Sequence, residues 1–230
     1  MPKQRATNPT ATRAARRAGK AASPRGKRDE IVASAIEHFG QEGYEDTKWA
    51  DIAADVGIGS TALYHYFESK LHCLYVIMAE ALATYLRNFE RITKESADYP
   101  SAIVALLRHE YDLNEQEVLR NRLLVAEQAL VGVHRTSPRE EEARQLARSR
   151  TRELEFAWAT FLARAMEQGV IPEADPRLLT RAVLGLHNSV WHWYRPGGTM
   201  PLDQVSDFYV PRCLAVLGLP PELAETASGD

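Results

Sequence analysis

Apolar residues recur at helical spacing along most of this chain. Ile31, Ala35 and Phe39 stand four residues apart, and Gly40 and Gly43 interrupt the stripe that they form. Apolar positions spaced by three or four residues lie on one face of an α-helix, and glycine is a frequent stop signal. The pattern therefore predicts an amphipathic helix that begins near residue 29 and ends near residue 40.

Two short helices are predicted next, over residues 47–56 and 60–67. Thr47 is the expected N-cap of the first, because its hydroxyl can accept a hydrogen bond from a free amide in the first turn. Gly57 can adopt the left-handed conformation that ends this helix. Two short helices joined by a tight glycine-containing turn are typical of a helix-turn-helix.

The remainder of the chain indicates further helices and no strands. Apolar residues keep helical spacing, and proline, glycine and capping residues separate the segments. The expected segments are 69–94, 100–133 with room for a break near residue 114, 138–168, 175–194 and 201–217. No stretch alternates as a strand does, so the predicted fold class is all-α.

Charge is distributed unevenly along the 230 residues. The whole chain has a formal net charge of −3. Residues 1–28 hold nine Lys and Arg and no Asp or Glu, so residues 29–230 by themselves carry about −12. Few large apolar side chains occur before residue 25, and we expect a disordered basic arm there. Such an arm can follow phosphates or enter a minor groove, with strongly salt-dependent binding. The alternative is a solvated tail without function.

Several classes of protein are disfavoured by what the sequence lacks. Cys73 and Cys213 lie far apart with no metal-ligand spacing, which argues against a disulfide framework and a zinc site and fits a reducing compartment. No run of about 18 apolar residues is present, so we expect a cytoplasmic protein without membrane contact. HExxH, GxSxG and Walker-type motifs are also absent, and we expect no enzyme, no catalytic residue, no cofactor and no bound metal.

The second short helix carries residues suited to DNA recognition. A helix in the major groove presents its first turns to base edges, while donors near helix ends meet phosphates and fix the register. The predicted base-reading residues are Ser60, Thr61, Tyr64 and His65. The predicted phosphate-contacting residues are Lys48, Tyr66 and Lys70.

Residues 29–71 resemble the DNA-binding domain of TetR-family regulators. The resemblance rests on the runs Ile52-Ala-Ala-Asp-Val-Gly-Ile58 and Ala62-Leu-Tyr-His-Tyr-Phe-Glu-Ser-Lys70 and covers about a fifth of the chain. It implies about nine helices, a homodimer, and a carboxy-terminal domain whose small-molecule effector weakens binding to a double-stranded DNA operator, most often in repression. Gly59 and Trp49 depart from the family pattern, in which a Ser or Thr cap and a smaller residue are common.

The run Trp191-His-Trp-Tyr-Arg-Pro-Gly-Gly198 is similar to a segment of family members that regulate lipid, sterol or acyl-CoA breakdown. This similarity implies an extended, largely apolar or lipid-like effector, such as a CoA thioester, in a cavity between helices of residues 100–190. The expected lining residues are Tyr111, Leu124, Gln128, Phe156, Trp158, Phe161 and His187.

Apolar faces on segments 175–194 and 201–217 have two possible partners. They can bury each other inside one subunit, or they can build the four-helix dimer interface that the resemblance implies. The resemblance favours the second, and the expected interface residues are Leu184, Trp191, Tyr194, Phe208, Leu214 and Leu217.

The sequence predicts a division of the chain into four parts and leaves two alternative functions open. We expect a disordered basic arm (1–25), a helix-turn-helix domain (26–72), a ligand-binding and dimerisation domain (73–219) and a flexible tail (220–230). One alternative function is a metal or redox sensor that uses Cys73 and histidines brought together by folding. The other is an architectural DNA-binding protein without an effector, driven by the basic arm.

Overall fold

The computed structural model describes residues 24–226, and every regular element in this range is helical. This confirms the all-α prediction. The elements are α2 (Pro24–Glu42), α3 (Trp49–Asp55), α4 (Ser60–Tyr66), α5 (Lys70–Glu95), α6 (Tyr99–His109), α7 (Glu115–Ala126), the short 3-10 helix η1 (Gln128–Gly132), α8 (Pro138–Glu167), α9 (Pro176–Trp193), α10 (Leu202–Val216) and α11 (Leu223–Thr226). Residues 1–23 of the expected basic arm lie outside the described residues, and residues 24 and 25 begin α2.

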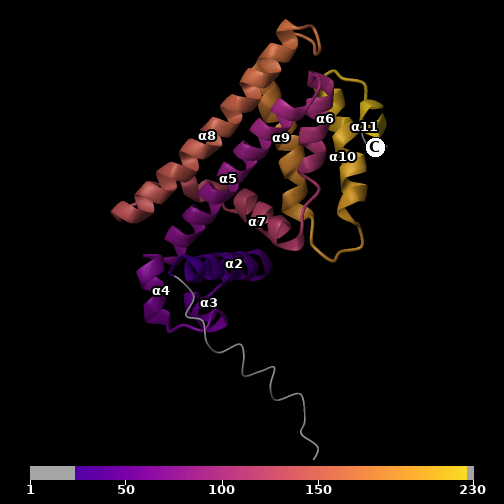
Figure 1. The fold of residues 1–230 in the computed structure, drawn as a ribbon. Helices are drawn as coiled ribbons and strands as arrows, with labels where there is room; N and C mark the ends of the chain where they lie inside the picture. Colours follow the sequence, from indigo (N-terminus) through magenta and orange to yellow (C-terminus); the bar gives the residue numbers. More distant parts are fainter. Residues whose placement is uncertain (1–23, 227–230) are drawn as a thin grey trace, which may run out of the picture.

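Helices α2, α3 and α4 form a unit at one end of the molecule, and α5 leads from it into the larger body (Figure 1). Helix α8 lies along α5, whereas α9 and α10 lie on the other side of the body. One apolar core joins α2–α4 to the first half of α5, and a second core fills the body. The expected domain boundary at residue 72 therefore falls inside α5, whose residues 73–79 still pack in the first core.

Side-chain caps explain where several helices begin. Ser69 accepts from the backbone N–H of His72 at the start of α5, and Asp175 accepts from two backbone N–H groups at the start of α9. Asn114 and Glu117 form a reciprocal capping box at the start of α7. This box accounts for the break near residue 114, which divides the predicted segment 100–133 into α6, α7 and η1.

Thr47 is not the N-cap of α3. Its hydroxyl donates to the carbonyl of Gly43 at 2.7 Å, and the side chain is buried in the turn before the helix. Lys48 occupies the N-cap position and makes no side-chain cap. The prediction was wrong because the hydroxyl is held inside the preceding turn.

The tail expected to be flexible from residue 220 contains ordered structure up to residue 226. Leu219 and Ala224 are buried in the second core, and Arg108 donates to the carbonyl of Ala224. Helix α10 ends at Val216, where left-handed Gly218 turns the chain, and the proline pair at 220 and 221 does not prevent the chain from packing again in α11. Residues 227–230 lie outside the described residues.

Gly40 does not interrupt α2, contrary to the prediction, because the helix continues to Glu42. The chain turns instead at Gly43, whose φ of 97° is left-handed. A Cβ atom at Gly40 would lie 2.7 Å from the Cβ of Leu119 on α7. Gly40 therefore permits a close approach between α2 of the small unit and α7 of the body.

The close approach predicts opposite effects of the same substitution at two helical glycines. Gly40→Ala must push α7 away and should lower the free energy of unfolding by about 1–3 kcal/mol. Gly185→Ala, in α9 with open space around the added methyl group, should raise it by about 0.5–1 kcal/mol. Denaturant unfolding at one protein concentration measures both. Equal stabilisation by the two substitutions would contradict the close packing.

Candidate nucleic-acid interface and ligand cavity

The turn between α3 and α4 is built on a left-handed glycine. Gly57 has a φ of 69°, which confirms its predicted role. The N–H of Gly57 donates to the carbonyl of Ala54 at 3.1 Å, and the N–H of Ile58 donates to the carbonyl of Ala53 at 2.9 Å. These bonds satisfy carbonyls at the end of α3 and set the direction in which α4 begins.

Contacts with α2 and the shared core fix the inner side of the two short helices. Ser34 donates to the Asp55 carboxylate at 2.6 Å, and the Lys27 ammonium donates to the carbonyl of Val56 at 3.2 Å. Leu63 and Phe67 are fully buried. One face of α4 is therefore committed to packing, and its orientation depends on α2.

Trp49 and Gly59, the two departures from the family pattern, have different consequences. The Trp49 ring packs edge-on against Phe67, with ring centroids 6.4 Å apart. Trp49 thus fills the space between α3 and the end of α4. Gly59 is the N-cap residue of α4 and supplies no side-chain cap, as its lack of a side chain implies.

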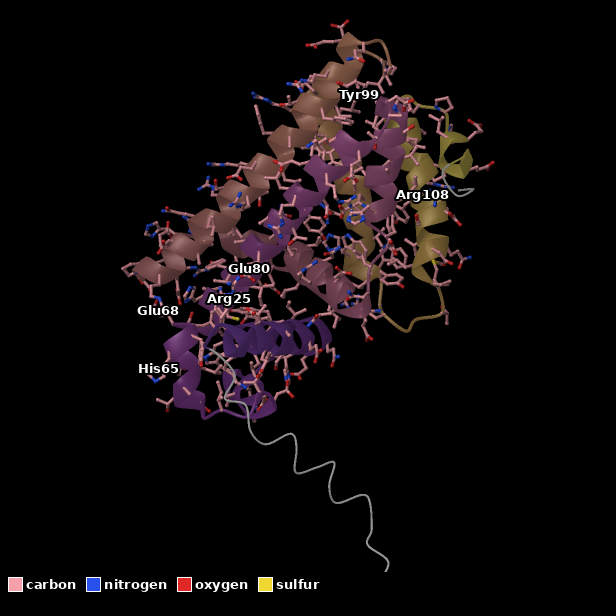
Figure 2. The ribbon with its side chains drawn as sticks, viewed as in Figure 1. Arg25, His65, Glu68, Glu80, Tyr99 and Arg108 are labelled. Atoms are coloured by element: carbon pink, nitrogen blue, oxygen red, sulfur yellow. The ribbon has the colours of Figure 1, made fainter. Side chains whose placement is uncertain are left out.

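The four predicted base-reading residues share the outer face of α4. Ser60, Thr61, Tyr64 and His65 are all exposed, and Tyr64 retains 54% of its accessible surface although it is large and aromatic. Figure 2 shows His65 on the outer side of α4. The structure brings these side chains together on a short helix, and their contacts with bases remain a prediction.

Lys70 was predicted to contact phosphate, but its ammonium points into the protein. The Nζ atom donates to the carbonyls of Tyr44, Glu45 and Thr47 at 2.6, 3.1 and 3.0 Å. It also lies 4.4 Å from the centroid of the Tyr44 ring. An ammonium group has three N–H donors, and all three are used here. Lys70 therefore ties the turn before α3 to the start of α5.

The other two predicted phosphate contacts differ in exposure. Lys48 is exposed at the start of α3, and its ammonium makes no hydrogen bond within residues 24–226. Tyr66 is half-buried and packs against the first core. Lys48 is thus free to meet a phosphate, whereas Tyr66 has only part of its side chain available.

The helix-turn-helix unit is acidic when it is considered without the arm. Residues 24–72 contain five Lys and Arg against nine Asp and Glu, a formal charge of −4. Duplex DNA is strongly anionic, so this balance disfavours non-specific attraction. Six further Lys and Arg occur in residues 1–23, outside the described residues.

The body contains a cavity of about 700 Å³ between α5, α6, α7, η1, α8 and α9. Four of the residues expected to contact a ligand, Leu124, Gln128, Trp158 and His187, line it, and ligand contact by them remains a prediction. Apolar side chains form much of its wall, among them Met78, Leu82, Phe89, Leu106, Leu107 and Val125. A volume of this size is typical of small-molecule sites.

Three other predicted lining residues lie elsewhere. Phe156 is 71% exposed, and with Phe161 it lines a second hollow between α5, α6 and α8. Phe156 precedes Trp158 by two positions, so the two side chains point about 200° apart around α8. Tyr111 lies behind the cavity wall, where its hydroxyl is 3.1 Å from the Nδ1 atom of His187.

Two titratable groups at the cavity wall are held in their neutral forms. His187 Nε2 accepts from the Trp191 indole N–H at 3.3 Å, and burial lowers the pKa of His187 to about 4. The Glu110 carboxyl lies 3.9 Å from the same Nε2 atom, and burial raises the pKa of Glu110 to about 8. The Glu110 side chain is 22% exposed, and it lines the cavity. At neutral pH the carboxyl is mostly protonated and faces an imidazole without charge.

Cations border the exposed side of the same cavity. Arg148 and Arg152 on α8 and Arg181 on α9 line it and are exposed to solvent. None of the three forms a salt bridge within the described range. The sequence reasoning missed these arginines and Glu110. A detectable signal was the spacing of Arg148 and Arg152, one turn apart on a helix that also carries Trp158.

Most of the residues predicted for the dimer interface are buried inside the subunit. Trp191, Tyr194, Leu214 and Leu217 belong to the second core, and Leu184 lines the cavity. Helices α9 and α10 pack against each other and against the body, so these five side chains are buried or half-buried within one subunit, and their place in a dimer interface remains a prediction. Among the six, only Phe208 is an exposed apolar side chain, at 53%.

Other apolar side chains are nevertheless exposed on the α9–α10 hairpin. The hairpin, residues 176–216 with the loop between its helices, holds five of the nine large apolar side chains that are exposed in the described range. They are Leu178, Trp193, Met200, Phe208 and Val216.

Both cysteines are buried and poorly suited to thiol chemistry. Burial raises the pKa of Cys213 to about 11 and that of Cys73 further above its usual range. Within residues 24–226 no three His, Cys, Asp or Glu side chains meet in a metal-binding arrangement. In the same range no helix combines the length and apolarity needed to cross a bilayer.

Two family models match this chain. The model of bacterial regulatory proteins of the tetR family matches residues 31–74, which include α3 and α4. The model of the tetracyclin repressor-like carboxy-terminal domain matches residues 115–217, from α7 to α10. Both the proposed DNA-binding unit and most of the cavity wall therefore fall within matched regions.

Individual relatives agree with these matches. The HTH-type transcriptional repressor KstR2 of Mycolicibacterium smegmatis is 24% identical over 199 residues, which cover 81% of this chain and 88% of that protein. The TetR family transcriptional regulator PfmR of Thermus thermophilus is 30% identical, with a TM-score of 0.66 over 82% of this chain and 97% of PfmR. AibR in complex with isovaleryl coenzyme A and operator DNA shares the fold, at 22% identity and a TM-score of 0.66 over 81% of this chain and 97% of AibR. This chain belongs to the TetR family of transcriptional regulators.

Proposed function

We propose that this chain is a ligand-responsive repressor that binds a palindromic operator as a homodimer and releases it when a small amphipathic molecule fills the cavity. The position of α7, between the cavity and the DNA-binding unit, is the main support for this proposal. Asn121 and Leu124 on this helix line the cavity, whereas Leu119 and Leu123 pack in the core that α2 shares with α3 and α4. A ligand that moves α7 therefore acts on the helix that orients the recognition helix.

A second link joins the cavity to the DNA-binding unit through η1. Val131 lines the cavity, and its carbonyl accepts from Arg144 at 2.7 Å. The neighbouring carbonyl of Leu130 accepts from the Tyr75 hydroxyl of α5 at 2.9 Å. Displacement of η1 by a ligand would break or shift bonds to α5, which begins directly after the recognition helix.

The recognition surface supports DNA reading by α4. This helix is short, its inner face is fixed by buried Leu63 and Phe67, and its outer face carries Thr61, Tyr64 and His65. Hydroxyl, phenol and imidazole groups can each exchange hydrogen bonds with base edges in the major groove. We propose that Lys48 supplies a phosphate contact at the start of α3.

We propose that the basic arm supplies positive charge for contacts with DNA phosphates. The described helix-turn-helix unit carries −4, whereas residues 1–23, which precede it in the sequence, hold six Lys and Arg and no Asp or Glu. Phosphate contacts from the arm would make operator binding fall steeply with salt concentration. An architectural role would need no cavity, and the cavity therefore favours the repressor over that alternative.

The cavity favours a ligand with an apolar body and an anionic end. Its wall is mainly apolar, and Arg148, Arg152 and Arg181 border its exposed side. Guanidinium groups bind phosphate and carboxylate oxygens with charge-assisted hydrogen bonds. A CoA thioester has both parts, and AibR, which shares this fold, is described in complex with isovaleryl coenzyme A and operator DNA.

The exposed apolar surface of the α9–α10 hairpin supports dimerisation there. Five of the nine large apolar side chains exposed in the described range lie on this hairpin, and a two-fold dimer suits a palindrome. We propose that Phe208, Val216 and their exposed neighbours on the hairpin meet the same surface of a second copy.

Selection of bound duplexes from a random library, with excess competitor DNA, tests operator recognition. We expect one palindrome with half-sites about 34 Å apart or a multiple of that distance. Tyr64→Ala should weaken binding to this sequence by about 1–3 kcal/mol, because the exposed phenol then no longer reaches the base edges. Phe156→Ala, on the exposed side of α8, should bind like the parent chain. Failure to enrich any sequence would contradict a sequence-specific repressor.

Substitution of Phe208 tests the dimer. Phe208→Glu removes an apolar ring from the proposed interface and adds a carboxylate that must lose water on dimerisation, with the Arg212 guanidinium beside it. The substitution should weaken dimerisation by about 1–3 kcal/mol and weaken operator binding with it. The matched control is Phe156→Glu, which places the same charge at an exposed phenylalanine on α8. Analytical ultracentrifugation measures the monomer–dimer equilibrium of both variants. A Phe208→Glu dimer as tight as that of the control would locate the interface elsewhere.

A further inference from the structure

The cavity wall contains a buried amide with unused hydrogen-bond donors. Asn121 is 2% exposed, and the Tyr85 hydroxyl donates to its Oδ1 atom. Its Nδ2 atom has no hydrogen-bond partner among the described residues. Both side chains line the cavity. A buried N–H group without an acceptor is costly, so its retention in a largely apolar wall requires a compensating partner.

The hydrogen bond with Tyr85 sets the direction in which the amide is presented. The hydroxyl proton of Tyr85 finds its acceptor in Asn121 Oδ1, which leaves the NH₂ group of Asn121 as the available end. An NH₂ group donates and does not accept. The partner that fits it is therefore an oxygen or nitrogen atom with a lone pair.

Glu110 adds a second donor to the same wall. Burial, opposed in part by Arg120, raises the pKa of Glu110 to about 8, so at neutral pH the carboxyl carries an O–H group. The charged and titratable groups placed around it are Tyr85 from α5, Tyr111 after α6, Glu117 and Arg120 from α7, and His187 from α9. His187 is neutral and its Nε2 atom already accepts from Trp191, so no ion pair with His187 compels Glu110 to ionise.

We propose that Asn121 and Glu110 form a recognition point for an uncharged carbonyl oxygen carried on the apolar body of the ligand. This inference rests on the proposed function, because the ligand concerned is the effector that fills the cavity. The arginines border the exposed side and suit an anionic end, whereas the Asn121–Glu110 pair offers neutral donors inside an apolar wall. The cavity thereby selects an oxygenated apolar body over a plain hydrocarbon.

Two isosteric probes isolate this recognition. In 2-methyl-1-undecene a CH₂ group replaces the carbonyl oxygen of 2-undecanone, so the two molecules have nearly the same shape and differ in one acceptor. Ligand-observed NMR titration of the full chain at pH 7 measures both dissociation constants. We expect the ketone to bind about tenfold more tightly, which corresponds to about 1.4 kcal/mol for one net hydrogen bond.

Variants assign the preference to the two residues. The double variant Tyr85→Phe/Asn121→Leu removes the amide and also the hydroxyl that loss of Asn121 would leave without an acceptor. It should reduce the ratio of the two dissociation constants towards one, by loss of ketone binding. Phe156→Leu, outside this cavity and in the second hollow, should leave the ratio at its parental value. Operator binding by each variant serves as the check that it is folded.

A pH series on the parent chain gives a second measurement that does not depend on the Asn121 variant. The carboxyl donor of Glu110 is present below its pKa and is lost as the pH rises through about 8, so the ketone preference should fall there. In Glu110→Gln the amide remains a donor at every pH, and the preference should persist.

The outcomes separate this inference from the proposed function. Equal binding of the two probes by the parent chain, or an undiminished preference in Tyr85→Phe/Asn121→Leu, overturns the recognition point and leaves a functional apolar cavity. Absence of binding by either probe overturns the effector cavity as well. Ketone preference that is lost in the double variant and declines above about pH 8 supports both residues.

Discussion

The contact between α2 and α7 is the constraint on which the arrangement of both functional parts depends. Gly40 has no side chain, and Leu119 occupies the space that a Cβ atom would need. Helix α7 can therefore pack directly on the helix that holds α3 and α4, while its other side lines the cavity. Close-packed interiors transmit small displacements because they cannot absorb them, so a shift of α7 is passed to α2. In the proposed mechanism a ligand favours one position of this contact and operator DNA favours another.

The two functional surfaces use charge in opposite ways. The described DNA-binding unit is acidic, and the outward face of α4 is polar and carries no Lys, Arg, Asp or Glu. In the proposed mechanism the basic arm and Lys48 supply positive charge for phosphates. The cavity combines arginines at its exposed side with Asn121 and a protonated Glu110 in its wall. In each proposed site the cations contribute affinity, because charges attract a ligand at long range. The neutral polar groups contribute selectivity, because their hydrogen bonds distinguish one ligand from another only on direct contact.

Local signals made much of the fold predictable, and non-local contacts account for the errors. Gly57 and the spacing of Leu63 and Phe67 specify the helix-turn-helix within a few residues of sequence. Helical periodicity places Trp158 and Phe156 on one helix but does not say which face meets the cavity. The apolar faces of α9 and α10 were ambiguous for the same reason, and Trp191 and Leu214 are buried inside the subunit. Lys70 contacts carbonyls more than twenty positions away, and Tyr85 on another helix occupies the amide oxygen of Asn121 while its N–H groups stay unused. Neither relation leaves a pattern in the sequence.

The most direct test of ligand-controlled DNA binding is the affinity of the chain for its selected operator, measured by fluorescence anisotropy with and without saturating CoA thioesters of increasing acyl length. Native mass spectrometry of the same samples establishes which thioesters are bound. We predict that at least one bound thioester lowers operator affinity by about 100-fold or more, which corresponds to a coupling free energy of about 3 kcal/mol. Thioesters that occupy the protein and leave operator affinity unchanged would contradict the proposed coupling through α7.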